Sequence, residues 1–477
     1  MKTGPRAALV MGLGRFGGGL GVVRWLFAKG YAVTVTDLAS EAALADTLGE
    51  LTDVERAALT LRLGEHRTED FVAADLVVVN PAVPPNAPHL VHARAAGARV
   101  TSEVELFLEH VPRATPLALI TGTQGKSSTA NLLAGALAGA GLDVTLAGNI
   151  GRSLLGELAG RSATTPGGPL VAELSSYQLE ALPAEDTHLA QADVVVITNL
   201  LVDHLARHGT PEAYHRAKLR ILDRCAPGGL ALLPASLTEA ALTPLLTPAQ
   251  AARIAGGDLH IERFQDTAAT DTAPAYRIGP GTFQGPAGPL AALDDLRLPG
   301  DFQRHNALAA LAAARALTPE VLDLTGVRGL VHRNEPLGHF GPHGTLVVDN
   351  GVSTTPDSTL AAIQALDGPV VLLAGGQPKN LPLDGLVRAG APHLARVLTF
   401  GAAAEDFAQA FIQGGVASEV CSSVDEAVER AFAGLGPGET LLFSPAAASF
   451  DAYSNFAQRA AAFRAALPPR RTAPFAL

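Results

Sequence analysis

The chain has 477 residues, of which 48% are hydrophobic and 17% are charged, and its formal net charge is −11. This length predicts about three domains, and the acidic balance argues against a protein that binds nucleic acid. The two cysteines, Cys225 and Cys421, cannot form a disulfide framework. The N-terminus has no apolar leader, and no apolar run reaches transmembrane length. We therefore expect a cytoplasmic protein without a membrane partner.

The first block of the chain has the pattern of a Rossmann-like domain. An apolar strand at Ala7–Met11 runs into Gly12-Leu-Gly-Arg-Phe-Gly17, and a helix is expected to about Lys29. A second strand over residues 31–36 ends at Asp37. Strand, Gly-x-Gly-x-x-Gly, helix and a following acidic residue are the fingerprint of a dinucleotide site. The same turn can bind other nucleotide diphosphates, so the residues alone leave NAD and another nucleotide as alternatives.

The second block opens with a phosphate-binding loop. A short apolar strand, residues 116–120, precedes Thr121-Gly-Thr-Gln-Gly-Lys-Ser-Ser-Thr129, and an Ala- and Leu-rich helix follows from Ser127. A helix N-terminus aims its N–H groups and positive dipole end at one point. Lys126 adds a cation, and the Ser127 hydroxyl suits a magnesium ion. The alternative is an ordinary Gly-rich turn with a chance lysine.

Polar side chains follow the next two predicted strands. Glu173 closes the strand at 170–172, and Asp203 and His204 come shortly after the strand at 193–199. Parallel sheets bind ligands at the carboxyl ends of their strands, so these side chains are candidate metal ligands. The alternatives are a solvated carboxylate and a structural histidine. Lys218 stands beside Arg216 and Arg220, and from position alone it would belong to a solvated helix face.

The pattern of the rest of the chain predicts a small accessory sheet and a third α/β block. Short strand-like pieces between Gly and Pro occupy residues 258–298, and their function is not readable. Beyond Gly329, strands are expected at 345–349, 369–374 and 439–443. The predicted fold is α/β with a Rossmann-like domain at 1–112, a central phosphate-loop domain at 113–329 and a Rossmann-like domain at 330–477.

Taken together, the motifs resemble those of the Mur ligase family, and the resemblance covers nearly the whole chain. The Glu-Leu-Ser-Ser-Tyr-Gln-Leu-Glu block, residues 173–180, looks like that of the family's D-glutamate-adding members. The motifs in chain order are residues 121–127, Asn149-Ile-Gly151, 173–180, Asp203-His204, Tyr214-x-x-x-Lys218, His332-Arg333, Gly375-Gly376 with Lys379, Ser444-Pro-Ala-Ala-Ala-Ser449, Asp451 and Asn455-Phe456.

The resemblance implies a site in each domain. The first domain would bind the UDP part of UDP-N-acetylmuramoyl-L-alanine, with contacts expected at Gly12, Gly14, Arg15, Phe16, Gly17, Asp37, Asn80 and Asn149. ATP contacts are expected at Gly122, Thr123, Gly125, Lys126, Ser127, Ser128, Asn306, Arg333 and Asp349. D-Glutamate would be bound by Thr355, Lys379, Ser449 and Phe456 in the third domain.

The resemblance also implies the catalytic groups, Lys126, His204 and Lys218, and two magnesium ions. Ser127 and Glu173 would hold one ion and His204 the other. Lys218 would be carbamylated by carbon dioxide and become an anionic oxygen ligand, which requires a depressed pKa. ATP would phosphorylate the substrate carboxylate, and the amine of D-glutamate would displace phosphate from the acyl phosphate. We expect a monomer acting in peptidoglycan precursor synthesis and cell division.

Several positions depart from the family pattern. Gln124 replaces the usual Asn of the phosphate loop, and Val352 replaces a common lysine. Phe302 and Gln303 interrupt the stretch that ends at Asn306, and Asp349-Asn350 stands where an Asn-Asp or Asp-Asp pair is expected. These changes weaken the individual assignments at Asn306 and Asp349 while leaving the ligase class intact.

Three other functions stay open on the sequence. One is a ligase of the same fold with a different amino acid or acceptor, which substrate competition would distinguish. Another is an NAD-dependent oxidoreductase, which explains Gly12–Gly17 and Asp37 but not the phosphate loop. A third is a nucleotide-binding regulator without catalysis.

Overall fold

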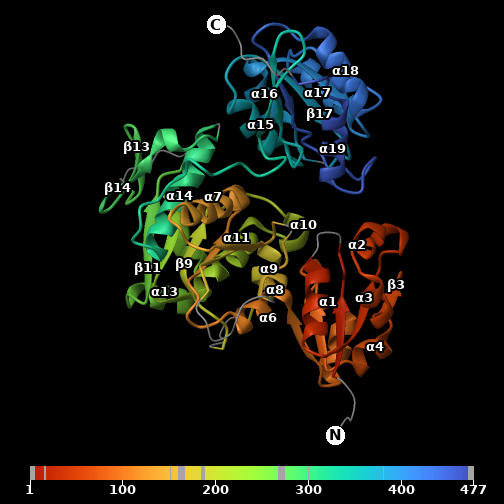
Figure 1. Ribbon diagram of the computed structural model, residues 1–477, viewed down its shortest axis with the longest axis vertical. Coiled ribbons are helices and arrows are strands. Elements are labelled where there is room, and N and C mark those ends of the chain that lie inside the picture. Colours follow the sequence, from red (N-terminus) through yellow and green to blue (C-terminus); the bar gives the residue numbers. More distant parts are fainter. Residues whose placement is uncertain are drawn as a thin grey trace. The chain divides into compact units, whose positions relative to one another are not determined.

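The computed structural model describes residues 6–14, 18–150, 152–158, 167–183, 188–266, 274–298, 300–379 and 381–470 (Figure 1). The chain divides into two compact units, Met1–Leu296 with His305–Val327, and Arg297–Arg304 with Arg328–Leu477. The first unit contains two parallel sheets and a small antiparallel one, and the second contains a mostly parallel sheet. The α/β prediction is confirmed. The three domain ranges given above stay predictions.

The N-terminal sheet is parallel, with strand order β3-β2-β1-β4-β5. Its strands are β1 (Ala7–Met11), β2 (Ala32–Asp37), β3 (Thr60–Leu63), β4 (Leu76–Val79) and β5 (Arg99–Ser102). Its helices are α1 (Gly18–Ala28), η1 (Ala42–Leu44), α2 (Ala45–Gly49), α3 (Asp53–Ala58), α4 (Thr68–Ala73), α5 (Pro88–Ala95) and α6 (Glu103–His110). The strand order reverses between β1 and β4, and ligands of such sheets bind outside the carboxyl ends of the strands at that point.

The central sheet is also parallel, with order β11-β10-β9-β6-β8-β7. Its strands are β6 (Leu117–Thr121), β7 (Thr145–Gly148), β8 (Leu170–Glu173), β9 (Ala192–Ile197), β10 (Cys225–Pro234) and β11 (Leu259–Phe264). Every residue of β6 and β8 is buried, as expected for strands covered on both faces. Because β6 lies between β8 and β9, the segments that follow these three strands meet at one edge.

Helices of the central sheet place the predicted site residues. They are α7 (Lys126–Gly139), α8 (Leu154–Leu158), α9 (Ser176–Ala181), α10 (Leu205–His208), α11 (Pro211–Leu219), η2 (Arg220–Arg224), α12 (Glu239–Leu242), η3 (Thr243–Leu245), α13 (Pro248–Ala255), η4 (Leu293–Asp295) and α14 (Asp301–Leu317). A capping box begins α9: Ser175 Oγ accepts from the Gln178 N–H, and Gln178 Oε1 accepts from the Ser175 N–H. This cap fixes the turn that follows Glu173.

The segment 258–298 is partly corrected by the structure. Its first strand, β11, pairs with β10 and so belongs to the central sheet. The accessory sheet is confirmed for the rest of the segment, as an antiparallel sheet of β12 (Arg277–Gly279), β13 (Thr282–Gly285) and β14 (Gly288–Ala292). A short strand pattern does not show which strand will pair with it. The sequence alone therefore could not separate β11 from the three strands of the accessory sheet.

The second unit has the sheet order β15-β16-β20-β17-β18-β19, parallel except for β15 (Glu335–Phe340). The expected strands are present as β16 (Thr345–Asp349), β17 (Val370–Gly375) and β20 (Thr440–Phe443), whereas β15, β18 (Leu394–Phe400) and β19 (Ser418–Val420) were not predicted. Its helices are α15 (Pro356–Gln364), α16 (Asp384–Gly390), η5 (Ala391–His393), α17 (Ala404–Gln413), α18 (Val424–Gly434) and α19 (Phe456–Ala466). Figure 1 shows α16, α17, α18 and α19 around β17.

No helix among the described residues is both long enough and apolar enough to cross a membrane.

Candidate functional site

The phosphate loop joins β6 to α7 with two glycines in conformations that other residues rarely adopt. Gly122 has φ 148°, and a Cβ there would lie 1.8 Å from Thr198 Oγ1. Gly125 has φ 77° and is the N-cap residue of α7. Only glycine fits both positions without strain. The predicted loop is therefore confirmed in form, with the N–H groups of the first turn of α7 at its end.

Two residues that the sequence did not single out hold this loop. Asn199 Oδ1 accepts from the Thr123 and Gln124 N–H groups, and Thr198 Oγ1 donates to the Gln124 carbonyl at 2.5 Å. Gln124, the residue that departs from the family pattern, thus contributes its main chain to the loop. Thr198 and Asn199 directly follow β9. Their position at the carboxyl end of a predicted strand could have indicated them as residues of the site.

Lys126, Ser127 and Asn306 lie at the same loop. Lys126 Nζ donates to the Thr123 carbonyl at 2.8 Å, and Ser127 is buried in the first turn of α7. A Cβ on Gly125 would lie 2.4 Å from Asn306 Oδ1, and Thr129 Oγ1 donates to the same oxygen at 3.4 Å. Asn306 therefore lies beside the loop as expected, on α14, which also includes Phe302 and the buried Gln303.

Glu173 reaches this edge from β8, where it is 1% exposed. It pairs in register with Ile120, which directly precedes Thr121 at the end of β6. Its Oε1 accepts from Asn149 Nδ2 at 3.1 Å, whereas Oε2 has no hydrogen-bond partner among the described residues. A buried carboxylate oxygen without a partner is costly. Asn149, expected at the substrate, is here the side-chain partner of Glu173.

His204 follows β9 in a left-handed conformation, with φ 52°. Its Nε2 lies 3.5 Å from Asp203 Oδ2, and its Nδ1 lies 3.4 Å from the Tyr177 hydroxyl. Burial lowers the pKa of His204, as do the nearby charges of Lys218 and Lys126, while Asp203 acts in the opposite direction. The imidazole is thus favoured in its neutral form, which is the form that binds metal ions.

Lys218 is buried, and this corrects the solvated-face interpretation of its helix. Only 1% of the residue is exposed, its Nζ donates to the Gly122 carbonyl at 2.6 Å, and Nζ lies 4.6 Å from the centre of the Tyr214 ring. Burial and the charge of Lys126 lower the pKa of Lys218 to about 6, against raising contributions from Asp203 and Glu173. The amine is therefore mostly neutral near pH 7 and able to act as a nucleophile.

The donor groups at this edge fit a magnesium ion. Glu173 offers an unpartnered carboxylate oxygen, and Ser127 offers a hydroxyl at the first turn of the neighbouring helix. Oxygen ligands of this kind, combined with phosphate oxygens, are what magnesium prefers. His204 adds a neutral imidazole at the same sheet edge.

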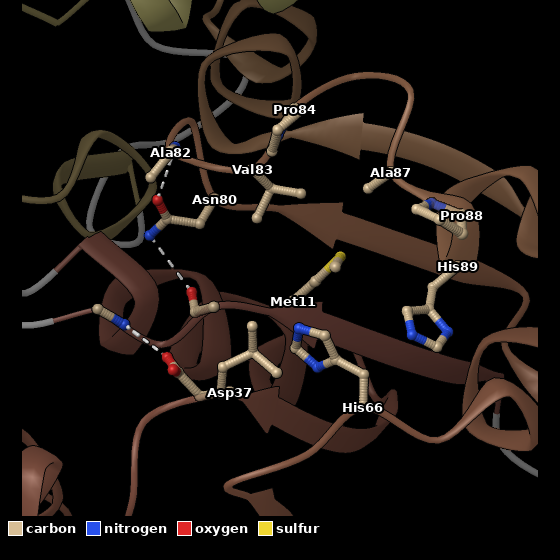
Figure 2. Close-up of a pocket in the computed structure, with 13 residues that line it drawn as sticks. Met11, Asp37, His66, Asn80, Ala82, Val83, Pro84, Ala87, Pro88 and His89 are labelled. Atoms are coloured by element: carbon tan, nitrogen blue, oxygen red, sulfur yellow. Dashed lines mark hydrogen bonds between the residues drawn. The ribbon is translucent and has the colours of Figure 1, made fainter. Parts of the chain in front are cut away.

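A cavity of about 560 Å³ lies at the strand-order reversal of the N-terminal sheet. It is lined by Met11, Gly12, Gly14, Asp37, Leu38, His66, Asn80, Ala82, Val83, Pro84, Ala87, Pro88 and His89 (Figure 2). The predicted Gly12, Gly14, Asp37 and Asn80 are thus brought together, whereas Arg15, Phe16 and Gly17 lie outside the described residues. Its two histidines were missed, because each follows a weakly patterned segment.

Asp37 and Asn80 shape the glycine turn of this cavity. Asp37 Oδ2 accepts from the Leu13 and Gly14 N–H groups at 2.8 and 3.3 Å, and Asn80 Nδ2 donates to the Gly12 carbonyl at 3.3 Å. A Cβ on Gly12 would lie 2.8 Å from Asn80 Cβ, so the close approach requires glycine.

In the second unit, the hydroxyl next to Lys379 belongs to Thr354. Lys379 Nζ donates to Thr354 Oγ1 at 2.9 Å. Thr355 Oγ1 instead accepts from the Ser358 N–H and caps α15. Of the other expected residues, Ser449 is buried in the loop after β20, and Phe456 begins α19 with its ring 6.3 Å from that of His332.

Asp349 ends β16 with no exposed side-chain surface and takes part in an ionic cluster. Its Oδ2 lies 2.7 Å from both His332 Nδ1 and a guanidinium nitrogen of Arg464, which also pairs with Glu335. His332, Glu335 and Asp349 are spaced as metal ligands could be, but the guanidinium of Arg464 already pairs with both carboxylates. Arg333 follows in the same turn, where its N–H donates to the Leu330 carbonyl.

Asn350, which departs from the family pattern, is buried next to Asp349 and donates to Ser444 Oγ at 3.0 Å. Val352 follows in the same loop, and its N–H donates to the His332 carbonyl.

Comparison with known proteins covers almost the entire chain. Residues 6–102 match the MurD-like N-terminal domain of Mur ligases, residues 120–314 the Mur ligase middle domain, and residues 332–447 the glutamate ligase domain of Mur ligases. The UDP-N-acetylmuramoylalanine–D-glutamate ligase of Roseiflexus sp. (strain RS-1) is 36% identical over 97% of this chain and 98% of its own length. This chain belongs to the Mur ligase family.

Other similar proteins agree with this assignment. The UDP-N-acetylmuramoylalanine–D-glutamate ligase of Symbiobacterium thermophilum is 33% identical over 97% of this chain and 98% of its own. Among solved structures, UDP-N-acetylmuramate–alanine ligase of Thermotoga maritima superimposes with a TM-score of 0.59 at 18% identity, over 96% of this chain and 98% of its own. Folylpolyglutamate synthase of Mycobacterium tuberculosis gives 0.55 at 16% identity, over 77% of this chain and 96% of its own. At these identities the structural matches establish the fold.

Proposed function

We propose that this Mur ligase joins D-glutamate to UDP-N-acetylmuramoyl-L-alanine with the consumption of ATP, in peptidoglycan precursor synthesis. The observation that carries the proposal is the meeting of a phosphate loop, Glu173, His204 and Lys218 at one edge of the central sheet. The whole-length similarity to ligases named for D-glutamate supports the choice of amino acid.

In this proposal the three domains are residues 1–112, 113–329 and 330–477, and they bind the UDP substrate, ATP and the amino acid respectively. The cavity at Gly12, Gly14, Asp37 and Asn80 supports the first assignment because its volume suits a nucleotide. The expected residues Lys379, Thr355, Ser449 and Phe456 would contact D-glutamate, and we add Thr354 because its hydroxyl lies next to Lys379. We also propose that Arg333 and Asp349 contact ATP.

The phosphate-loop residues would orient the triphosphate and stabilise charge during transfer. Lys126 and the N–H groups of the first turn of α7 would bind the phosphates, while Asn199 and Thr198 hold the loop by hydrogen bonds. Preorganised donors of this kind need no rearrangement as negative charge develops. When bound, magnesium would act as a Lewis acid on the phosphate oxygens.

Ser127 and Glu173 would hold one magnesium ion, and His204 with Lys218 a second. Lys218 qualifies because its neutral amine can add to carbon dioxide: the nitrogen lone pair forms the N–C bond, and the nitrogen loses a proton. The product is a carbamate anion, which replaces a cation with an oxygen ligand. Burial and Lys126 favour the loss of charge that this step needs.

The substrate carboxylate would accept the γ-phosphoryl group, giving an acyl phosphate and ADP. The amine of D-glutamate would then attack the acyl carbon, phosphate would leave, and an amide bond would remain. The protein's part is positioning and electrostatic stabilisation, as in other phosphoryl transfers.

Phosphate release from ATP tests the proposal, with magnesium, UDP-N-acetylmuramoyl-L-alanine, and D-glutamate, L-glutamate or L-lysine in turn. Release that requires D-glutamate supports the proposed function. Release with another amino acid would assign the chain to a sibling activity, and release with none would favour a nucleotide-binding regulator. Titration with NAD under the same conditions tests the oxidoreductase alternative.

A further inference from the structure

The cavity of the N-terminal domain has two chemically different ends. Gly12, Gly14, Asp37 and Asn80 form a polar end at the glycine turn, whereas His66 and His89 stand at the other end beside Met11 and Pro88 (Figure 2). A diphosphate suits the N-terminus of α1, which follows the glycine turn. A flat base suits the aromatic and apolar end, where rings and hydrocarbon can cover its faces.

The hydrogen bonds of His66 fix which nitrogen has the proton. Thr36 Oγ1 lies 3.1 Å from the Glu65 carbonyl and 2.7 Å from His66 Nδ1. The Thr36 hydroxyl has one proton, and a carbonyl can only accept, so that proton goes to Glu65. Both contacts are hydrogen bonds at once when Oγ1 accepts from Nδ1–H of His66. The neutral imidazole consequently has its lone pair on Nε2, for which no partner is present among the described residues.

The ring of His66 is held in place by its neighbours. His89 lies edge to face with it at 5.5 Å between ring centres, and the buried Phe71 lies edge to face at 5.9 Å. His89 is itself stacked on Phe71 at 4.9 Å, and its Nδ1 lies 3.4 Å from Thr68 Oγ1. These contacts order the base end of the cavity before any ligand binds.

We propose that His66 is a specificity-determining residue that recognises uracil, with Nε2 accepting a hydrogen bond from the N3–H group of the base. The proposal rests on the proposed function, in which a UDP derivative occupies this cavity. Uracil has a donor at N3, whereas cytosine has an acceptor there. An acceptor on the protein therefore favours uracil. With cytosine, the lone pair of N3 would face the lone pair of His66 Nε2, and the two would repel each other.

The charge state of His66 agrees with an acceptor role. Burial lowers the pKa of His66, the neighbouring His89 lowers it further, and Asp37 acts in the opposite direction. These are the titratable groups that influence the ring. The neutral form consequently predominates at neutral pH, and acidification below the ordinary histidine pKa would turn Nε2 into a donor.

Calorimetric binding of UDP, CDP and N3-methyl-UDP to the full chain near neutral pH tests the proposal. We expect the wild type to bind UDP at least about tenfold more tightly than either analogue, since an unmatched polar pair costs of the order of one hydrogen bond. Equal affinity for the three nucleotides would overturn the role of His66 and leave the proposed function standing. Absence of UDP binding would count against the proposed function itself.

Variants make the test specific to one atom. His66→Phe keeps a flat ring without the acceptor, and we expect its preference for UDP over CDP to fall to near unity. His66→Gln offers an amide oxygen near the position of Nε2, and part of the preference should return. His92→Gln is the matched control, because His92 is exposed on α5 and outside the cavity. Full discrimination in His66→Phe, measured on folded protein, would contradict the proposal.

Acidification gives a readout that a merely structural histidine would not change. Below the ordinary histidine pKa, the wild type should lose its preference for UDP over CDP, because protonated His66 can donate to N3 of cytosine. His66→Gln should retain its smaller preference over the same range. A wild-type preference that is independent of pH down to loss of folding would contradict the assignment.

Discussion

Lys218 Nζ donates to the carbonyl oxygen of Gly122, the first residue after β6, at 2.6 Å. A buried lysine therefore contacts the main chain of the phosphate loop directly. The residue that would become a metal ligand is held next to the glycine that starts the loop.

The depressed pKa of Lys218 predicts a cost to stability that carbamylation would remove. The unfolded chain binds this proton below pH 10.5, whereas the folded chain binds it only below about pH 6. The unfolded state has more protons between these values, so stability rises with pH across the window. We expect Lys218→Met to be inactive but more stable at neutral pH, because methionine has no charged form to desolvate on folding. Chemical unfolding without magnesium and carbon dioxide measures the difference, which should vanish near pH 10.5.

Removal of carbon dioxide should reduce turnover reversibly. The adduct forms from the neutral amine, which predominates above about pH 6, so the effect of added bicarbonate should disappear as the pH falls below that value. Phosphate release in degassed buffer, before and after bicarbonate addition, measures it. Lys218→Arg is the control, because its guanidinium cannot be carbamylated, and it should stay inactive. Activity that is indifferent to bicarbonate would exclude a carbamate.

Glu173→Gln should weaken magnesium binding without unfolding the protein. The amide can keep the contact with Asn149 at Oε1, but the unpartnered oxygen is replaced by a neutral group. We expect the magnesium concentration for half-maximal activity to rise by about tenfold or more. Stability without magnesium should be unchanged or higher, because an uncompensated buried carboxylate is lost. An unaltered magnesium dependence would remove Glu173 from the metal site.

The neighbouring threonines should respond differently to substitution. Thr354→Val removes the hydroxyl next to Lys379, and KM for D-glutamate should rise roughly tenfold with little loss of stability. Thr355→Ala removes the cap of α15, which should cost about 1 kcal/mol with a smaller change in KM. Steady-state kinetics and thermal unfolding of the pair separate the two roles. The reverse pattern would make Thr355 the contact residue and give Thr354 a structural role.

Arg464→Met should destabilise the second unit strongly. Asp349 is fully buried, and Arg464 provides its charged partner together with His332. Breaking a buried pair from one side costs about 3–5 kcal/mol. Hydrogen exchange of β16 measures this cost locally. The double variant Arg464→Met with Asp349→Asn should recover part of it, and no recovery would mean that the cost does not come from the unpaired charge.

Much of the site around the phosphate loop was predictable, because parallel sheets bind ligands at the carboxyl ends of their strands. Glu173 and His204 end or follow buried strands, so the strand pattern alone predicted their shared edge. The burial of Lys218 was not predictable from the local sequence, where Arg216 and Arg220 are close neighbours. Its depth depends on packing against Tyr214 and the phosphate loop, which a local pattern does not contain.

Other residues were missed for equally physical reasons. Thr354 and Thr355 are chemically identical neighbours, and only the start of α15 decides which hydroxyl is used as a cap. His66 follows β3, a short edge strand with few buried residues, so its segment has little periodicity. β19 has only three residues, none of them buried, so a local pattern could not reveal it.

The register of β6 with β8 and β9 sets the positions of the side chains around the phosphate loop. Ile120 pairs with Glu173 on one side, and Thr121 pairs with Ile197 on the other. A shift of β8 by one residue would turn Glu173 to the opposite face of the sheet. The buried hydrocarbon side chains that prevent this shift, such as Leu119, Ala172 and Val195, touch no substrate. Selection for catalysis therefore acts on them as well, through the spacing that they enforce.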